Sequence, residues 1–295
     1  MSSEADAFAP LVQLDLGCRY HGVGDLIEGC LKLSPRHVDI IAAQLVVELV
    51  VQIPSLRDFT SETLDSYQIP LDGQLERNSD YLFEFSLRVP HYDEAGDLLP
   101  PGNASGISYF IRIVQIGKVP MTLKAHRVLV YPEYPEEELR ESLGLEKCIS
   151  NCSSAALKKG FTTSGKLSVS TNGAVVLSPF QASSVSLVID FCSCKCLPPK
   201  ITGISYKIKQ YSSSLLCRQA SCELASSCLT TSNCIRWIKS DQKHVALLSV
   251  PVALPAIRVP SFTYRGTTTS YAVSITISTT KGKIKHKTPI LALTN

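Results

Sequence analysis

Apolar and polar side chains alternate residue by residue along several stretches of this chain. The clearest alternations run through residues 83–89, 185–191 and 271–277, where every second residue is Phe, Leu, Val, Ile or Tyr. The residues between them are mostly polar or small. A period of two is typical of strands that bury one face. The pattern therefore predicts an all-β protein.

Turn-forming residues punctuate these stretches. Asn172-Gly173 separates residues 167–171 from residues 174–177, and an Asn-Gly pair supplies the positive φ angles of a tight hairpin turn. Further breaks come at Pro70, Gly73, Pro100-Pro101-Gly102, Pro198-Pro199 and Gly266. Many short strands with such punctuation indicate β-sandwiches.

One segment is ambiguous between strand and helix. Gln44, Glu48 and Gln52 recur every four residues within residues 40–53, as the polar face of an amphipathic helix would. The same run is rich in Val, Ile and Leu, which favours a strand. We expect a strand and keep the helix as the alternative.

The length of 295 residues favours two domains over one. The best boundary lies between Pro132 and Ala156, where Pro135 precedes Glu136, Glu137 and Glu138. Proline at the start and glutamates in the first turn favour a short helix. We predict domains at residues 1–132 and 157–295, joined by a linker at 133–156 that contains this helix.

Charge divides the chain at the same place. Residues 1–147 hold 23 acidic and 12 basic side chains, a net charge of −11, whereas residues 148–295 hold 3 acidic and 17 basic ones, a net charge of +14. Such asymmetry indicates different partners for the two halves. The basic half is suited to anionic lipid, phosphate or an acidic protein surface.

The N-terminal residues and the cysteines indicate a cytoplasmic protein. The first ten residues carry Glu4 and Asp6 and lack a long apolar stretch, so we expect no signal peptide. The longest apolar run, residues 40–53, is too short to span a bilayer as a helix. Eleven cysteines without a signal peptide favour reduced thiols over a disulfide framework.

Several motifs resemble the arrestin-fold family, especially alpha-arrestins and the arrestin-like subunits of retromer-type sorting complexes. Residues 20–33 are similar to the family's opening Y-x-x-G-D-x-I-x-G-x-L-x-L strand pair. The F-x-F, L-P-P and G-x-I-x-Y-x-I elements of its amino-terminal domain resemble residues 82–90, 98–101 and 106–112. Its carboxy-terminal domain resembles residues 165–169, 185–191, 204–208, 251–255, 271–277 and 288–290. The likeness covers nearly the whole chain in the family's order.

This resemblance implies two arrestin-type, immunoglobulin-like β-sandwiches in tandem. It implies a cytoplasmic adaptor or scaffold, peripheral at endosomal or plasma membranes, that binds membrane-protein cargo tails or coat proteins in trafficking. The alternative is a constitutive subunit of a retromer-type sorting complex. Both Pro-Pro pairs, before Gly102 and Lys200, lack the Tyr of the PPxY motif by which alpha-arrestins recruit ubiquitin ligases.

A candidate charged site lies near the carboxyl end. Lys281, Lys283, Lys285 and Lys287 alternate with other residues, so an extended chain places four ammonium groups on one face. Such a face is suited to anionic lipid head groups or phosphate. Lysines also protect edge strands from aggregation, and this alternative stays open.

Two further patterns carry less chemistry. Residues 160–166 fit the first seven positions of a P-loop, but Leu167 stands where a Ser or Thr should meet Mg²⁺, and the following residues alternate as a strand. Cys192, Cys194 and Cys196, then Cys217, Cys222, Cys228 and Cys234, lack the paired spacing of a zinc site. We expect no nucleotide, metal or other cofactor.

No catalytic motif stands out in the sequence. It contains no G-x-S-x-G elbow and no H-E-x-x-H, and its six histidines are scattered. Aromatic residues are not interleaved with the lysines, so nucleic-acid binding is disfavoured. The sequence predicts a binding protein that is not an enzyme and has no small-molecule substrate.

Overall fold

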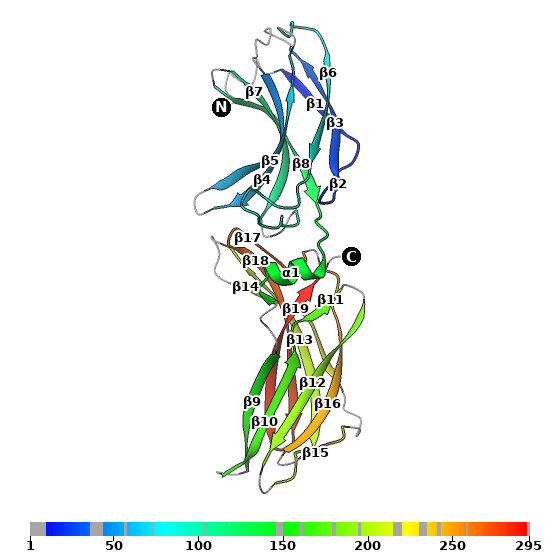
Figure 1. Ribbon diagram of the computed structural model, residues 1–295, viewed down its shortest axis with the longest axis vertical. Helices are drawn as coiled ribbons and strands as arrows, with labels where there is room; N and C mark the ends of the chain where they lie inside the picture. The colour runs from blue at the N-terminus through cyan, green and yellow to red at the C-terminus, as the bar shows by residue number, and fades with distance from the viewer. Residues whose placement is uncertain are drawn as a thin grey trace. The chain divides into compact units, whose positions relative to one another are not determined.

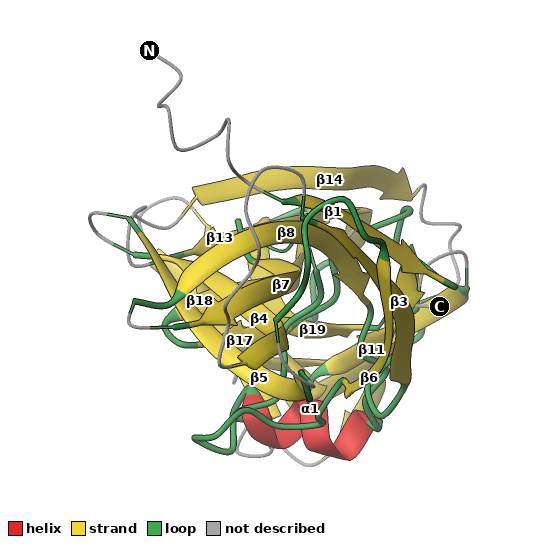
Figure 2. Cartoon of the chain, turned by 90° about the horizontal axis from the view of Figure 1, so that it is seen from above, coloured by secondary structure: helices red, strands yellow, loops and turns green. Residues whose placement is uncertain are grey.

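The computed structural model describes residues 10–35, 44–55, 58–71, 74–102, 104, 106–117, 119–145, 150–159, 162–178, 181–193, 196–214, 220–229, 235–240, 243–257 and 259–293. Within these residues the chain is mostly β, with nineteen strands and one short helix (Figure 1, Figure 2). The predicted all-β character is confirmed. The chain divides into two compact units, Met1–Glu133 and Tyr134–Asn295.

The first unit contains two sheets. The smaller has the order β1-β3-β6 and is antiparallel; the larger has the order β2-β8-β7-β4-β5, in which only β2 pairs in parallel. The strands are β1 Leu11–Leu16, β2 Tyr20–His21, β3 Leu26–Ser34, β4 Gln44–Pro54, β5 Phe59–Ile69, β6 Tyr81–Arg88, β7 Ser108–Ile116 and β8 Met121–Val130.

The second unit also contains two sheets, with the orders β15-β16-β12-β10-β9 and β11-β19-β18-β13-β14; β17 pairs with β18 beside the second path. The elements are α1 Glu136–Ser142, β9 Ser150–Lys159, β10 Thr162–Asn172, β11 Val175–Leu177, β12 Ala182–Cys192, β13 Ile201–Ser213, β14 Ala220–Leu229, β15 Ile238–Ser240, β16 Lys243–Ala253, β17 Phe262–Tyr264, β18 Thr267–Thr279 and β19 Gly282–Ala292.

The two units share one sheet topology. In each, a very short strand, β2 or β11, pairs in parallel with the last long strand, and β8-β7-β4-β5 corresponds in chain order to β19-β18-β13-β14. The partner sheets correspond as β1-β3-β6 and β10-β12-β16. Even the register shift recurs, between β4 and β5 and again between β13 and β14. The second unit adds α1, β9, β15 and β17.

Alternating burial explains why these residues form strands. Along β6, Phe85 and Leu87 are buried while Glu84 and Arg88 are exposed. In the second unit the buried residues of both sheets form one cluster, to which β12 contributes Leu187 and β18 contributes Ile275. Burial of each such side chain favours folding by about 1.5–3 kcal/mol. Each sheet therefore turns one face to a core and the other to solvent.

The ambiguous run is a strand where it is described. Residues 44–54 form β4, and residues 40–43 lie outside the described part. Residues four apart share a strand face as well as a helix face, so the spacing of Gln44, Glu48 and Gln52 fits both. Glu48 lies opposite Arg112 of β7 and forms a salt bridge with it: Arg112 Nη2 lies 2.7 Å from Glu48 Oε2.

The hairpin predicted at Asn172-Gly173 is wrong. Gly173 does adopt a positive φ of 67°, but β11 does not turn back to pair with β10. It crosses to the other sheet and pairs in parallel with β19. The Asn-Gly pair specifies a local change of direction, and the burial of Leu177 decides which sheet receives the strand.

The segment predicted as a linker contains the expected helix and the start of a strand. Pro135 is the N-cap residue of α1, and Glu136, Glu137 and Glu138 occupy its first turn. Acidic side chains there complement the positive end of the helix dipole. β9 begins at Ser150, inside the predicted linker, and belongs to the second unit's sheet.

Replacing Leu187 with Ala should destabilise the second unit by about 2–5 kcal/mol, because it empties a core position that is 1% exposed. Leu247→Ala is the matched control, since Leu247 on the neighbouring strand β16 is 70% exposed. Urea unfolding monitored by circular dichroism measures both. Equal effects of the two substitutions would contradict the burial pattern.

Candidate functional surfaces

The structure brings together three of the four lysines of the predicted patch. Lys283, Lys285 and Lys287 lie on β19 and are exposed, alternating with three buried residues. Lys281 lies in the preceding turn. Its ammonium donates a hydrogen bond to the carbonyl oxygen of Leu197 at 3.1 Å and lies 5.7 Å from the ring centre of Phe191. Lys281 is therefore engaged elsewhere.

The sheet register adds two lysines that the sequence analysis did not include. On β18, Ser274 lies opposite Lys287 of β19 and Lys207 of β13, and Lys209 shares the outward face two residues further along β13. We call Lys207, Lys209, Lys283, Lys285 and Lys287 the lysine face. The alternation of Lys207 and Lys209 with Ile208 is visible in the sequence, but only strand pairing places them beside β19.

A single carboxylate lies among these lysines in the described residues. Glu223 of β14 pairs in register with Lys209, and its Oε2 accepts a hydrogen bond from Lys207 Nζ at 2.8 Å. The hydrogen bond from Lys207 holds the pKa of Glu223 below its usual range, with a smaller contribution from Lys209. Five lysines and one carboxylate give the lysine face a formal net charge of +4.

The middle of the lysine face contains one cation–π contact and one covered hydroxyl. The ammonium of Lys287 lies 4.1 Å from the ring centre of Tyr211, within cation–π range. Beside it, the Ser274 hydroxyl oxygen is covered from solvent and makes no hydrogen bond to the described residues. Lys287 thus contacts Tyr211, and Lys283 and Lys285 are exposed on the same strand.

A buried polar cluster lies on the other side of β19. His286 is 1% exposed; its Nδ1 lies 3.0 Å from the Ser153 hydroxyl, and its Nε2 lies 3.2 Å from that of Thr171 and 3.0 Å from that of Thr288. Burial holds the pKa of His286 below its usual range, since the charged imidazolium is disfavoured there. The cluster joins β19 to β9 and β10 across the core.

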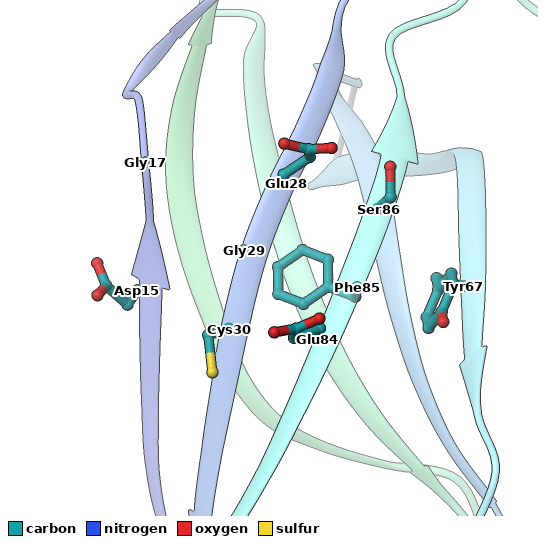
Figure 3. Close-up of a pocket in the computed structure, with 9 residues that line it drawn as sticks. All are labelled: Asp15, Gly17, Glu28, Gly29, Cys30, Tyr67, Glu84, Phe85 and Ser86. Atoms are coloured by element: carbon teal, nitrogen blue, oxygen red, sulfur yellow. The ribbon is translucent and has the colours of Figure 1, made fainter.

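The first unit carries a hollow of about 620 Å³ that the sequence analysis missed (Figure 3). Strand pairing places Asp15, Cys30 and Glu84 side by side, with Glu28 and Ser86 in the next row. The lining residues are Asp15, Gly17, Glu28, Gly29, Cys30, Tyr67, Glu84, Phe85 and Ser86. Its three carboxylates form no salt bridge with other described residues.

Neither surface gathers a metal-binding cluster from the described residues. No three His, Cys, Asp or Glu side chains among the described residues gather closely enough to hold a metal ion. The carboxylates of the hollow form no such group either. The cysteines described there, among them Cys192, Cys196, Cys222 and Cys228, are free thiols. Cys194, Cys217 and Cys234 lie outside the described residues.

The P-loop-like segment falls on a strand. β10 spans Thr162–Asn172, and Lys166 pairs in register with Ala156 and Cys192. Gly160 and Phe161 lie outside the described residues. A P-loop requires a helix after its lysine, and here the strand continues through Asn172.

Comparisons with known proteins add no identity. Neither a protein-family model nor a curated protein sequence matches this chain. Among the described residues, no helix is long and apolar enough to cross a membrane. The two surfaces must therefore be interpreted from their own chemistry.

Acidification should destabilise the second unit through His286. Histidine in an unfolded chain takes up a proton near pH 6.5, and His286 does so only at lower pH when folded. The unfolded state then binds more protons, so stability falls as the pH drops below about 6.5. Urea midpoints at about pH 7.5 and 5.5 should differ less in the His286→Gln variant than in the wild type.

His91→Gln is the control for this titration, because His91 is exposed. Its second unit should keep the pH dependence of the wild type. Burial also lowers the pKa of His21, so the first unit has a pH dependence of its own in the same direction. An unchanged pH dependence in His286→Gln would show that the buried cluster does not titrate.

Gly29→Ala should destabilise the first unit by about 1–3 kcal/mol, because the added methyl group overfills the floor of the hollow. A Cβ on Gly29 would lie 2.5 Å from Cζ of Phe85 and 2.9 Å from the backbone oxygen of Asp15. Gly17 lines the same hollow, and a Cβ there meets no atom within 4 Å. Gly17→Ala should therefore leave the urea midpoint nearly unchanged, and a loss equal to that of Gly29→Ala would contradict this packing.

Proposed function

We propose that this chain is an arrestin-like adaptor or scaffold that binds other proteins and catalyses no reaction. In this proposal residues 1–132 and 157–295 are two arrestin-type β-sandwiches. They act at the cytoplasmic surface of endosomal or plasma membranes and hold cargo tails or coat proteins. The observation that supports it is the repetition of one sheet topology in both units, each with the same long strand at its open edge.

Two of the edge strands, β5 and β14, occupy corresponding places in the two units. Among the described residues, β5 pairs only with β4 and β14 only with β13, so one side of each strand forms no ladder with another described strand. Neither strand contains Lys or Pro, the residues that commonly block edge pairing. An extended peptide can add to such an edge through main-chain hydrogen bonds.

The register shifts refine this picture. They place Leu64 of β5 and Leu224 of β14 at bulges, which bend the strand and interrupt regular pairing. A partner strand would therefore have to match either side of the bulge. Such a requirement favours selective peptides over indiscriminate aggregation.

The alternative is a constitutive subunit of a retromer-type sorting complex. An adaptor exchanges partners, whereas a subunit stays in one assembly. Size-exclusion chromatography of the native protein separates the two: a constant large complex supports the subunit, and a cargo-dependent change of elution supports the adaptor.

Placing lysines on the β14 edge should abolish partner binding there. The double variant Ala220→Lys, Cys222→Lys adds two exposed charges to that edge, on the face opposite the lysine face. Ser184→Lys, Ser186→Lys adds the same charge to β12, a strand whose neighbours are β10 and β16. Proximity labelling in native cells should lose membrane-protein and coat components with the edge variant and keep them with the control.

Two results would count against the adaptor. One is labelling that contains no membrane-trafficking component for the wild type. The other is the same set of partners for the wild type and both variants, which would exclude β14 as the binding edge and leave β5 to be tested by the same design.

A further inference from the structure

The lysine face combines high positive charge with short side chains between the lysines. Successive lysines of β19 stand about 7 Å apart, and those of β13 lie about 10 Å away across β18. Between them β18 presents Ser274, Thr276 and Ser278, whose side chains are short. The ammonium groups therefore rise above a shallow strip of hydroxyls.

We propose that the lysine face docks on the surface of an anionic membrane. An extended array of lipid phosphates and carboxylates matches an array of ammonium groups without requiring a pocket. Basic side chains near such a surface bind through its negative potential, and the attraction decays within a Debye length. This inference stands independently of the adaptor function, because it uses a sheet face and not a strand edge.

Apart from Glu223, the acidic cluster of the second unit lies on helix α1, away from the part of the lysine face that carries Lys285. The acidic helix α1 contacts β17, and β17 pairs with Thr267–Thr269 at the start of β18. Lys285 pairs with Thr276, seven residues further along β18, which places it about 23 Å from that end. This distance exceeds the Debye length of about 8 Å at physiological salt, so α1 barely weakens the field at Lys285.

The surface suits a membrane better than a nucleic acid or a peptide. The ammonium of Lys287 lies over one face of Tyr211, the aromatic ring on the outward rows of β13, and competes there with a stacked base. The neighbouring aromatic residues Tyr206 and Tyr271 are buried. The outward positions around the lysines offer hydroxyls in place of an apolar groove, so a peptide would find no anchor pocket.

The test is co-sedimentation of the full chain with vesicles containing equal parts of phosphatidylserine and phosphatidylcholine. The triple variant Lys283→Gln, Lys285→Gln, Lys287→Gln should bind the vesicles roughly a hundredfold more weakly. Each lysine that is lost should weaken binding by about fivefold. The wild type should not sediment with vesicles of phosphatidylcholine alone, and higher salt should release it.

The matched control is Lys166→Gln, Lys239→Gln, Lys243→Gln. These exposed lysines lie on β10, β15 and β16 of the other sheet, and their loss changes the net charge by the same amount. Control binding within about threefold of the wild type supports the proposal, because distant charges are screened. Circular dichroism and the urea midpoint confirm that each variant is folded; if the triple variant is not, Lys283→Gln, Lys285→Gln replaces it with an expected loss of more than tenfold.

Three results would overturn the proposal. Equal weakening by both triple variants would mean that net charge alone drives binding. Undiminished binding of the lysine-face variant would place the membrane contact elsewhere. Tighter, face-dependent binding to duplex DNA than to the anionic vesicles would identify the face as a nucleic-acid surface. Intact vesicle binding by the β14 edge variant, with its partners lost, would separate this inference from the adaptor function.

Discussion

Burial of one side of each long strand is the constraint on which the rest of this structure depends. In the second unit, Leu187 of one sheet and Ile275 of the other belong to the same core. That requirement sets the alternation of side chains along each strand, and the alternation in turn directs every second residue outward. The outward residues carry little of the folding free energy and are free to differ in chemistry. Function in such a molecule is therefore expected on faces and edges.

The two units share a topology, but two sheet faces that do not correspond, one in each unit, carry opposite charge. In the first, the outward face of β1-β3-β6 carries Asp15, Glu28 and Glu84 around a hollow. In the second, the outward face of β19-β18-β13 carries lysines. The shared order of strands gives the two units a corresponding edge strand, β5 and β14. Our proposal assigns peptide partners to the edges and an anionic membrane to the lysine face.

The sequence predicted what depends on local alternation. Residues 83–89, 185–191 and 271–277 became β6, β12 and β18, and the strand alternative for β4 proved correct in its described part. Pairing between distant strands was not predictable in the same way. β11 left its expected hairpin for a parallel partner more than 100 residues away in the chain. A turn motif determines the conformation of about four residues. The sheet that β11 joins depends on where its buried residue Leu177 packs.

The candidate sites follow the same rule. Lys283, Lys285 and Lys287 were found from the sequence because they share one strand, but Lys207 and Lys209 join them only through the register of β13 and β18. Lys281 is not part of the lysine face because β19 begins one residue later, at Gly282. The residues that line the acidic hollow come from β1 and the bend that follows it, and from β3, β5 and β6, and no single stretch of sequence contains its pattern. In the sequence, His286 is one more polar residue among the lysines. In the structure it is buried beside Thr171.

The central claim is that each unit has its own core and an outer strand that pairs on one side only. Residue-resolved amide hydrogen exchange of the full chain tests it most directly. We predict protection on both sides of the central strands β4, β7, β13 and β18, and along β5 and β14 an alternation in which every second amide exchanges rapidly, because only alternate amides of an antiparallel edge strand face its partner. Uniform protection along β14 or β5, or rapid exchange throughout β13 and β18, would contradict the account.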